Sequence, residues 1–184
     1  MKRKSLSVTK KTLNFYLTKL KDPQVRKLYN LFSNNLASMD LTNKKIMVGV
    51  SGGADSLAVL FFSHCYALKH HTKLYPIIID HKLRKESTIE AKNLRYKLKQ
   101  NFKINCKILS KKIVKINKNI QSYARDLRYD LFFEECNKQK IDYLILGHHK
   151  DDLIENFFIR FLRGSGLKGL VSFDKNVINY NGIK

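Results

Sequence analysis

The segment 51–56, which reads Ser-Gly-Gly-Ala-Asp-Ser, constrains the fold of this chain more than any other part of its sequence. It follows the apolar run 46–50, which is typical of a buried strand, and it precedes the apolar residues 57–62, which predict the start of a buried helix. A glycine turn between a strand and a helix lets backbone N–H groups converge on an anion, and the helix dipole adds to the attraction. The segment therefore predicts a phosphate site.

The segment matches neither of two common phosphate-binding motifs. No Lys-Ser/Thr pair follows the second glycine, as a P-loop requires, and no third glycine stands at the spacing of a dinucleotide fingerprint. It resembles instead the pyrophosphate-binding PP-loop of enzymes that cleave ATP, adenylate a substrate and release pyrophosphate. An ordinary turn with a helix N-cap is the alternative interpretation.

Length and composition indicate one domain in a reducing compartment. A chain of 184 residues can bury one core, and Cys65, Cys106 and Cys136 lie too far apart for a zinc site or a disulfide framework. No apolar run reaches the length of a membrane span, and the first twenty residues are basic without a signal-peptide hydrophobic block. We expect a cytoplasmic protein without a membrane partner. A plastid or another organelle is the alternative location.

The net charge of +21 is concentrated in two blocks. Residues 1–45 carry a net charge of +9 and residues 81–128 a net charge of +12, whereas the remaining segments are neutral overall. Such blocks favour a polyanionic partner whose binding depends strongly on salt. A solvated surface rich in lysine, produced by a genome rich in A and T, explains the same composition.

Apolar patterns predict strands that alternate with helices, without a linker or a repeat. The predicted strands are 46–50, 74–79, 104–109 and 143–146, and the predicted helices are 23–39, 56–70, 87–100, 120–138 and 151–163. This order predicts an α/β fold with a doubly wound parallel sheet, of the Rossmann-like kind. We expect a basic N-terminal extension over residues 1–44, which contains a helix. An ATP-binding catalytic domain is expected over residues 45–184.

Unusual polar residues follow three of the predicted strands. They are the segment 51–56, the segment 80–84, which reads Asp-His-Lys-Leu-Arg, and the segment 147–152, which reads Gly-His-His-Lys-Asp-Asp. In an open parallel sheet, ligands bind beyond the carboxyl ends of the strands where the strand order reverses. The three segments therefore predict one pocket.

The segment 148–170 combines the pattern of an apolar helix face with histidine, carboxylate and arginine side chains. Asp151 and Glu155 are four residues apart and so share a helix face. Carboxylates at the start of a helix and arginines near its end are also expected from the helix dipole alone. That explanation does not account for the adjacent histidines 148 and 149, nor for the sequence Arg-Gly-Ser-Gly over 163–166.

Four blocks together resemble the tRNA(Ile)-lysidine synthetase family, bacterial and plastid enzymes that use ATP to attach lysine to the wobble cytidine of tRNA(Ile). The blocks are 51–56, 80–91, 119–129 and 148–170, and the resemblance covers about residues 45–172. Leu153 and Asn156 depart from the family pattern, where Gln and Thr are usual. Family members continue into further tRNA-binding parts, so we expect this chain to be a fragment, a split gene product or a minimal form.

The resemblance implies an ATP-dependent ligase that acts through an adenylated cytidine, with Mg²⁺ sharing the charge of the phosphates. It implies as partners free L-lysine and a tRNA(Ile) with a CAU anticodon, and it leaves homodimer formation open. The implied ATP-binding residues are Ser51, Gly52, Gly53, Ala54, Asp55, Ser56 and Arg125, with Asp55 as the candidate magnesium ligand. The implied catalytic or lysine-binding residues are Asp80, His148, Asp151, Asp152 and Glu155. The implied tRNA-binding residues are Arg84, Arg128, Arg160, Arg163, Gly164, Ser165 and Gly166.

Other classes of function stay open. A PP-loop enzyme that thiolates tRNA cytidine generally carries a Cys-x-x-Cys motif for sulfur or an iron–sulfur cluster, and this chain has no such motif. A PP-loop amidotransferase-type ligase would need a source of ammonia. A remnant that binds RNA without turnover is the non-enzymatic alternative, and pyrophosphate release from ATP distinguishes it from an enzyme.

Overall fold

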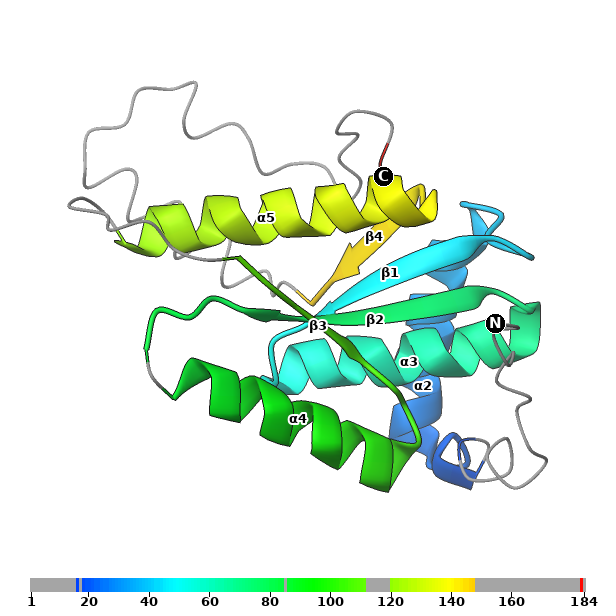
Figure 1. Ribbon diagram of the computed structural model, residues 1–184. Coiled ribbons are helices and arrows are strands. Elements are labelled where there is room, and N and C mark those ends of the chain that lie inside the picture. The colour runs from blue at the N-terminus through cyan, green and yellow to red at the C-terminus, as the bar shows by residue number, and fades with distance from the viewer. Residues whose placement is uncertain (1–15, 17, 85, 112–119, 148–182, 184) are drawn as a thin grey trace, which may run out of the picture.

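The computed structural model describes residues 16, 18–84, 86–111, 120–147 and 183, and it shows a parallel sheet with helices on both faces (Figure 1). The described strands are β1 Lys45–Val50, β2 Lys73–Asp80, β3 Lys107–Ser110 and β4 Tyr143–Leu146. They form one sheet in the order β3-β2-β1-β4, and every neighbouring pair is parallel. The predicted α/β fold is therefore confirmed.

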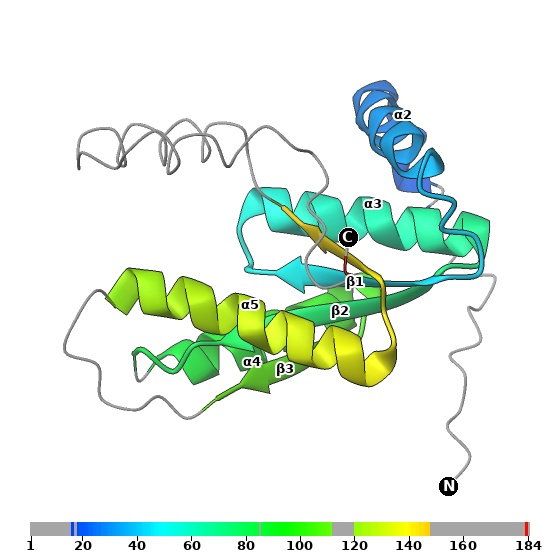
Figure 2. The same cartoon turned by 90° about the horizontal axis from the view of Figure 1, so that it is seen from above.

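The described helices form two layers around this sheet. They are α2 Pro23–Ala37, α3 Ala54–His70, α4 Ser87–Phe102 and α5 Ile120–Gln139. Helices α3 and α4 cover one face and α5 covers the other, while α2 lies outside α3 (Figures 1 and 2). None of the helices in the described ranges has the length and apolar character of a membrane span.

The two faces of β1 belong to two separate apolar clusters. Ile46 and Val48 pack with residues of α2, α3 and α4, whereas Met47 packs with Phe132 and Cys136 of α5. Alternate side chains of a strand point to opposite faces, so a strand covered on both faces is apolar throughout. This burial explains why the short run 46–50 was recognisable in the sequence.

Helix α2 is packed against the domain. Asp22 caps it by accepting hydrogen bonds from the backbone N–H groups of Gln24 and Val25, at 2.9 and 3.1 Å. The ring of Tyr29 lies 6.0 Å from that of Phe62 on α3, between ring centroids. The helix predicted over 23–39 is thus present and ends at residue 37. The division of the chain at residue 45 into an extension and a domain stays a prediction.

One predicted strand is shorter than expected. The apolar pattern predicted a strand over 104–109, but β3 begins at Lys107. Lys103 adopts a left-handed conformation with φ 54°, and the Ile104 N–H donates to the Leu98 carbonyl at 3.2 Å, so the chain turns back and ends the helix here. Ile104 is buried as part of this helix stop, so its apolar character does not indicate a strand. The helix predicted over 151–163 lies outside the described residues.

Candidate functional site

The three strands β1, β2 and β4 end at one edge of the sheet, and a pocket of about 820 Å³ lies there. The strand order reverses between β1 and β4, which is where an open parallel sheet binds ligands. The pocket is lined by Ser51, Gly52 and Ser56 after β1, by the loop that follows β2, by one side of α4, by Arg128 of α5 and by Gly147 after β4.

A single buried hydroxyl holds the loop between β1 and α3. The Ser56 Oγ accepts hydrogen bonds from the backbone N–H groups of Ser51 and Gly52, each at 3.2 Å, and from the Ser51 hydroxyl at 3.0 Å. It donates to the Gly53 carbonyl at 2.9 Å. Gly52 has φ +93°, a backbone conformation that favours glycine. Ser56, predicted to bind ATP, therefore shapes the loop from within.

Among the described residues, no side chain caps the start of α3. Its N-cap is Gly53, which makes no side-chain hydrogen bond to the helix, and Asp55 in the first turn is exposed. A Cβ atom built on Gly53 would meet only the Ser51 Oγ, at 3.6 Å, so the space beside this residue is open. The first N–H groups of a helix carry partial positive charge and need an acceptor. The geometry suits an anion at this helix start.

Gly147, which follows β4, lies against the same helix start. A Cβ atom built on Gly147 would come within 2.8 Å of the Ser56 Cα and 2.9 Å of the Ser56 nitrogen. These are backbone atoms, so no side chain at position 147 fits without moving the loop or the strand. Gly147 was not among the predicted site residues, although a glycine directly after a buried strand is a recognisable signal in the sequence.

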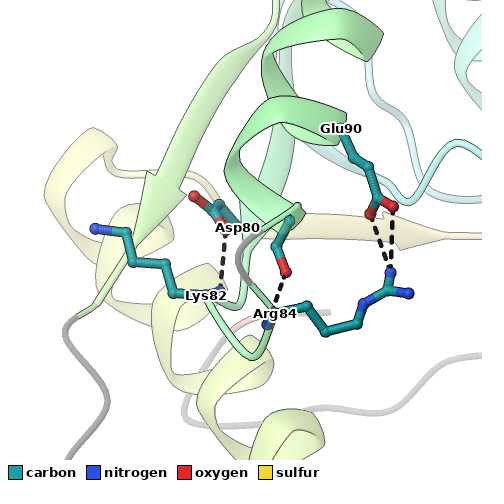
Figure 3. A network of polar contacts seen from close by, with 5 residues as sticks. Asp80, Lys82, Arg84 and Glu90 are labelled. Atoms are coloured by element: carbon teal, nitrogen blue, oxygen red, sulfur yellow. Dashed lines mark hydrogen bonds and ion pairs between the residues drawn. The ribbon is translucent and has the colours of Figure 1, made fainter.

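Asp80, predicted to be catalytic, is buried and organises the loop after β2 (Figure 3). One carboxylate oxygen accepts from the backbone N–H of Lys82 at 3.0 Å, and the other accepts from the Thr88 hydroxyl at 2.7 Å. Lys82 has φ 51°, so the turn places a lysine in a conformation that side chains rarely adopt. Asp80 thus joins the loop to the first turn of α4. Thr88 was not predicted, and nothing in the sequence pattern distinguished it.

Arg84 lines the pocket but is already paired. Its guanidinium group contacts the Glu90 carboxylate at 3.0 Å, and both side chains are exposed (Figure 3). An exposed pair of this kind contributes little to stability and can exchange one partner for another. The Arg84 backbone N–H also donates to the Ser87 hydroxyl at 3.2 Å, which fixes the turn into α4.

His81 and Arg128 face the pocket from different elements. Burial lowers the pKa of His81, the neighbouring Arg128 lowers it further, and Asp80 opposes both effects. His81 is therefore neutral near pH 7, and its Nδ1 is buried without a hydrogen-bond partner in the described ranges. Burial also lowers the pKa of Arg128, but an arginine stays charged at neutral pH. His81 was part of a motif but was not among the predicted site residues.

The two arginines predicted on α5 have different surroundings. Arg128 lines the pocket, whereas Arg125 stacks on the ring of Tyr129, with its Cζ 5.9 Å from the ring centroid. Arg125 was expected to contact ATP and Arg128 to contact tRNA. Both assignments stay predictions, and the position of Arg128 favours it for the phosphates.

The remaining predicted site residues lie outside the described residues. They are His148, Asp151, Asp152, Glu155, Arg160, Arg163, Gly164, Ser165 and Gly166. Within the described ranges, no group of three or more His, Cys, Asp or Glu side chains could hold a metal ion. The three cysteines are buried, burial raises the pKa of each thiol to about 12, and none lines the pocket.

Comparison with known proteins gives the same family for most of the chain. The family model described as a PP-loop domain matches residues 20–184. A tRNA(Ile)-lysidine synthase of Orientia tsutsugamushi is 42% identical over 137 residues, which are 74% of this chain and 31% of the relative. The enzyme of the same name from Wolbachia pipientis is 38% identical over 151 residues, which are 81% of this chain and 35% of the relative. This chain spans about a third of the length of these relatives.

A solved structure supports the fold. The U34-tRNA thiolase of Methanococcus maripaludis, determined with its 4Fe–4S cluster, superposes with a TM-score of 0.66 at 21% sequence identity. The match covers 86% of this chain and 58% of the thiolase. The glycine loop and the pocket at the reversal of strand order agree with these matches. The chain belongs to the PP-loop family, and the relatives reported above are tRNA(Ile)-lysidine synthases.

Proposed function

We propose that this chain is the ATP-binding part of an enzyme that joins lysine to the wobble cytidine of tRNA(Ile). The observation that carries the proposal is the uncapped start of α3, which borders a pocket with Arg128 on its wall. The names of the relatives support the choice of tRNA and lysine. The pocket volume of about 820 Å³ is in the range of sites that bind a nucleotide-sized ligand.

The pocket residues suit the triphosphate of ATP. The N–H groups at the start of α3 would bind the β- and γ-phosphates, and the open space beside Gly53 would admit them. The Arg128 guanidinium group would stabilise the charge that develops as pyrophosphate leaves. Within the described residues, no hydrogen bond or ion pair to a protein group occupies this guanidinium group.

Asp55 is the described carboxylate that fits a magnesium ion. It is exposed in the first turn of α3, and its carboxylate makes no hydrogen bond or ion pair with the other described residues. Both oxygens of Asp80 are used by Lys82 and Thr88. Mg²⁺ usually keeps several waters and binds one or two carboxylates together with substrate phosphates, so one carboxylate suffices. Bound there, the ion would neutralise part of the phosphate charge.

The reaction needs two steps. The O2 atom of cytosine attacks the α-phosphorus of ATP, and the bond from that phosphorus to the β-phosphate oxygen breaks, which releases pyrophosphate. The ε-amine of lysine, after it loses a proton, then attacks C2, and the C2–O bond breaks to release AMP. The resemblance assigns the second step to His148, Asp151, Asp152 and Glu155, because lysine needs a base and a partner for its ammonium group.

The proposal is tested by the dependence of pyrophosphate release on both substrates. The full chain is incubated with ATP and Mg²⁺, and pyrophosphate is measured with and without lysine and an unmodified tRNA(Ile) that carries the CAU anticodon. We expect release to require the tRNA, and nuclease digestion with mass spectrometry to find lysine on the wobble cytidine. ATP binding without any tRNA-dependent release would favour a remnant that binds RNA. Sulfur incorporation from a supplied donor would favour a thiolase.

A variant of Glu155 separates the two steps. In Glu155→Gln, we expect lysine transfer to drop while ATP binding and adenylate formation on the tRNA persist, because a carboxylate suits an ammonium group and repels a triphosphate. A Gly53→Val variant is the matched control, since it should block ATP and therefore both steps. Equal loss of ATP binding and lysine transfer in Glu155→Gln would contradict this assignment.

A further inference from the structure

The outer surface of α4 carries an exposed stripe of large and basic side chains. Ile89, Lys92, Tyr96, Lys99 and Lys103 follow one another at intervals of three and four residues, so they share one side of the helix and its end. All five are exposed, with Ile89 at 61% and Tyr96 at 64% of their full accessible surface. We call these five residues the α4 stripe.

The cations of the α4 stripe are not neutralised within the described part of the chain. None of Lys92, Lys99 and Lys103 forms an ion pair there, and the acidic Glu90 at the start of the helix is taken by Arg84. The opposite layer differs. Lys107 and Lys111 are paired with Glu135 and Glu134 of α5, at 2.7 and 3.1 Å. Among the described residues of 81–128, the positive charge is therefore least compensated on α4.

Helix α4 carries the α4 stripe and also contributes residues to the lining of the candidate ATP pocket. Asn93 and Lys97, which are one residue away from Lys92 and Tyr96, line that pocket. Helix α4 packs on β2 and β3 and lies at the margin of its layer, beside α3 (Figure 1). Helix α4 therefore presents one side to the pocket and another side, with the α4 stripe, to solvent.

We propose that the α4 stripe binds an unpaired RNA strand, with Tyr96 stacking against a base and the lysines following the phosphates. An exposed aromatic ring between cations is the combination that proteins use for single-stranded nucleic acid, because every base has a π-face. No aromatic or cation–π contact among the described residues occupies the Tyr96 ring. The inference rests on the proposed function only in taking the strand to be the substrate tRNA loop.

Binding of a labelled, unstructured single-stranded oligoribonucleotide to the full chain tests the stacking contact. We expect Tyr96→Ala to raise the Kd about tenfold, as loss of one stacked base implies. Tyr96→Phe keeps the ring and should stay near the wild-type Kd. A fully base-paired RNA of the same length should respond little to Tyr96→Ala, since its bases cannot reach the ring. Thermal unfolding of each variant shows that the fold is retained.

The salt dependence of binding tests the lysines separately. Each phosphate contact on a single strand contributes about 0.7 to the slope of log affinity against log salt, so a Lys92→Gln, Lys99→Gln double variant should lower that slope by about 1.4. Tyr96→Ala should lower the affinity and leave the slope unchanged. Lys111→Gln is the matched control, because this exposed lysine is already paired with Glu134 and should change neither quantity.

Wild-type affinity in Tyr96→Ala, with an unchanged slope in the double lysine variant, would overturn the proposal. Sedimentation that shows a dimer lost in Tyr96→Ala, with RNA binding intact, would overturn it in favour of a second copy of this chain on the α4 stripe. The assay needs neither ATP nor lysine. If the variants weaken RNA binding but no lysine-dependent reaction is found, the inference holds and the proposed function fails.

Discussion

Helices α2 and α3 begin in opposite ways, although they pack against each other. The start of α2 is closed by the Asp22 carboxylate, which accepts two backbone N–H groups. The start of α3 has glycine at the same position, and no side chain in the described part of the protein caps it. A capping carboxylate stabilises a helix and occupies the N–H groups that an anion would need. The difference supports the proposal that the start of α3 binds an anion, whereas the start of α2 only stabilises its own helix.

The neighbours of the two helix starts agree with this distinction. The α2 start lies in an exposed turn, with Pro23 in its first turn. The α3 start is held by the buried Ser56 hydroxyl and by the close approach of Gly147. A loop fixed by such contacts keeps its N–H groups in place before the ligand arrives, which lowers the entropy cost of binding.

Capping the start of α3 should have the largest effect on ATP affinity. Gly53 has φ −70° and ψ 160°, the extended conformation of an ordinary N-cap, so Gly53→Asp should cap α3 in the way Asp22 caps α2. We expect ATP affinity to fall by about 100-fold or more, equivalent to about 2.7 kcal/mol, because the carboxylate takes the N–H groups and repels phosphate. Isothermal titration measures the affinity.

The stability of the same variant decides the interpretation. Urea unfolding of Gly53→Asp should show stability equal to or greater than that of the wild type. A comparison with Gly53→Val separates the added carboxylate from added bulk. Wild-type ATP affinity in Gly53→Asp would contradict the proposal that the start of α3 is the phosphate site.

Removing the hydroxyl that shapes the loop should have the next largest effect. Ser56→Ala leaves the N–H groups of Ser51 and Gly52 without their acceptor, so we expect unfolding to become easier by about 1–3 kcal/mol and ATP affinity to fall about tenfold. Ser63→Ala is the control: Ser63 is buried on the same helix, but its hydroxyl has no hydrogen-bond partner among the residues that the structure describes. Urea unfolding and titration should find Ser63→Ala close to wild type in both quantities.

Lowering the pH should decrease the stability of the fold through His64 of α3, which lies away from the start of that helix. Burial lowers the pKa of His64 to about 4, below its ordinary value of 6.5. Below that ordinary value the unfolded chain binds a proton that the folded chain does not, so the free energy of unfolding should fall by about 2 kcal/mol between about pH 6.5 and pH 5. The urea midpoint across this range measures it.

A His64→Leu variant should flatten the pH dependence of stability. The slope that remains would come from groups such as His81, whose pKa is also lowered. An identical pH profile in wild type and His64→Leu would show that His64 does not couple folding to protonation.

Removing the Asp22 cap of α2 should have the smallest effect, a modest loss of stability with no change in ATP affinity. Asp22→Ala removes the cap of α2, and we expect the free energy of unfolding to fall by about 1 kcal/mol. ATP affinity should not change, because α2 lies outside α3 and contributes no residue to the pocket lining (Figure 2). Weaker ATP binding in Asp22→Ala would mean that the two helix starts are coupled.

Local pattern predicted most of the elements and the family. Strand β1 was placed within one residue, and α5 was expected over 120–138 and runs over Ile120–Gln139. The glycine loop between a strand and a helix was readable because its function depends on neighbours in sequence. The end of the strand predicted over 104–109 was less readable, since a buried residue in a helix stop has the same apolar character as one in a strand.

What each polar residue does depends on contacts between distant segments. Only the folded chain shows that the Asp80 oxygens are taken by its own loop, and only the neighbouring strand makes Gly147 necessary. The local pattern of the helix does not show that Arg128, and not Arg125, reaches the pocket. Arg128 precedes Phe132 by four residues on the side of α5 that packs against β1, and so it reaches the pocket. The sequence determined where the helices and strands form, because that depends on local periodicity, whereas their packing decided which side chains meet.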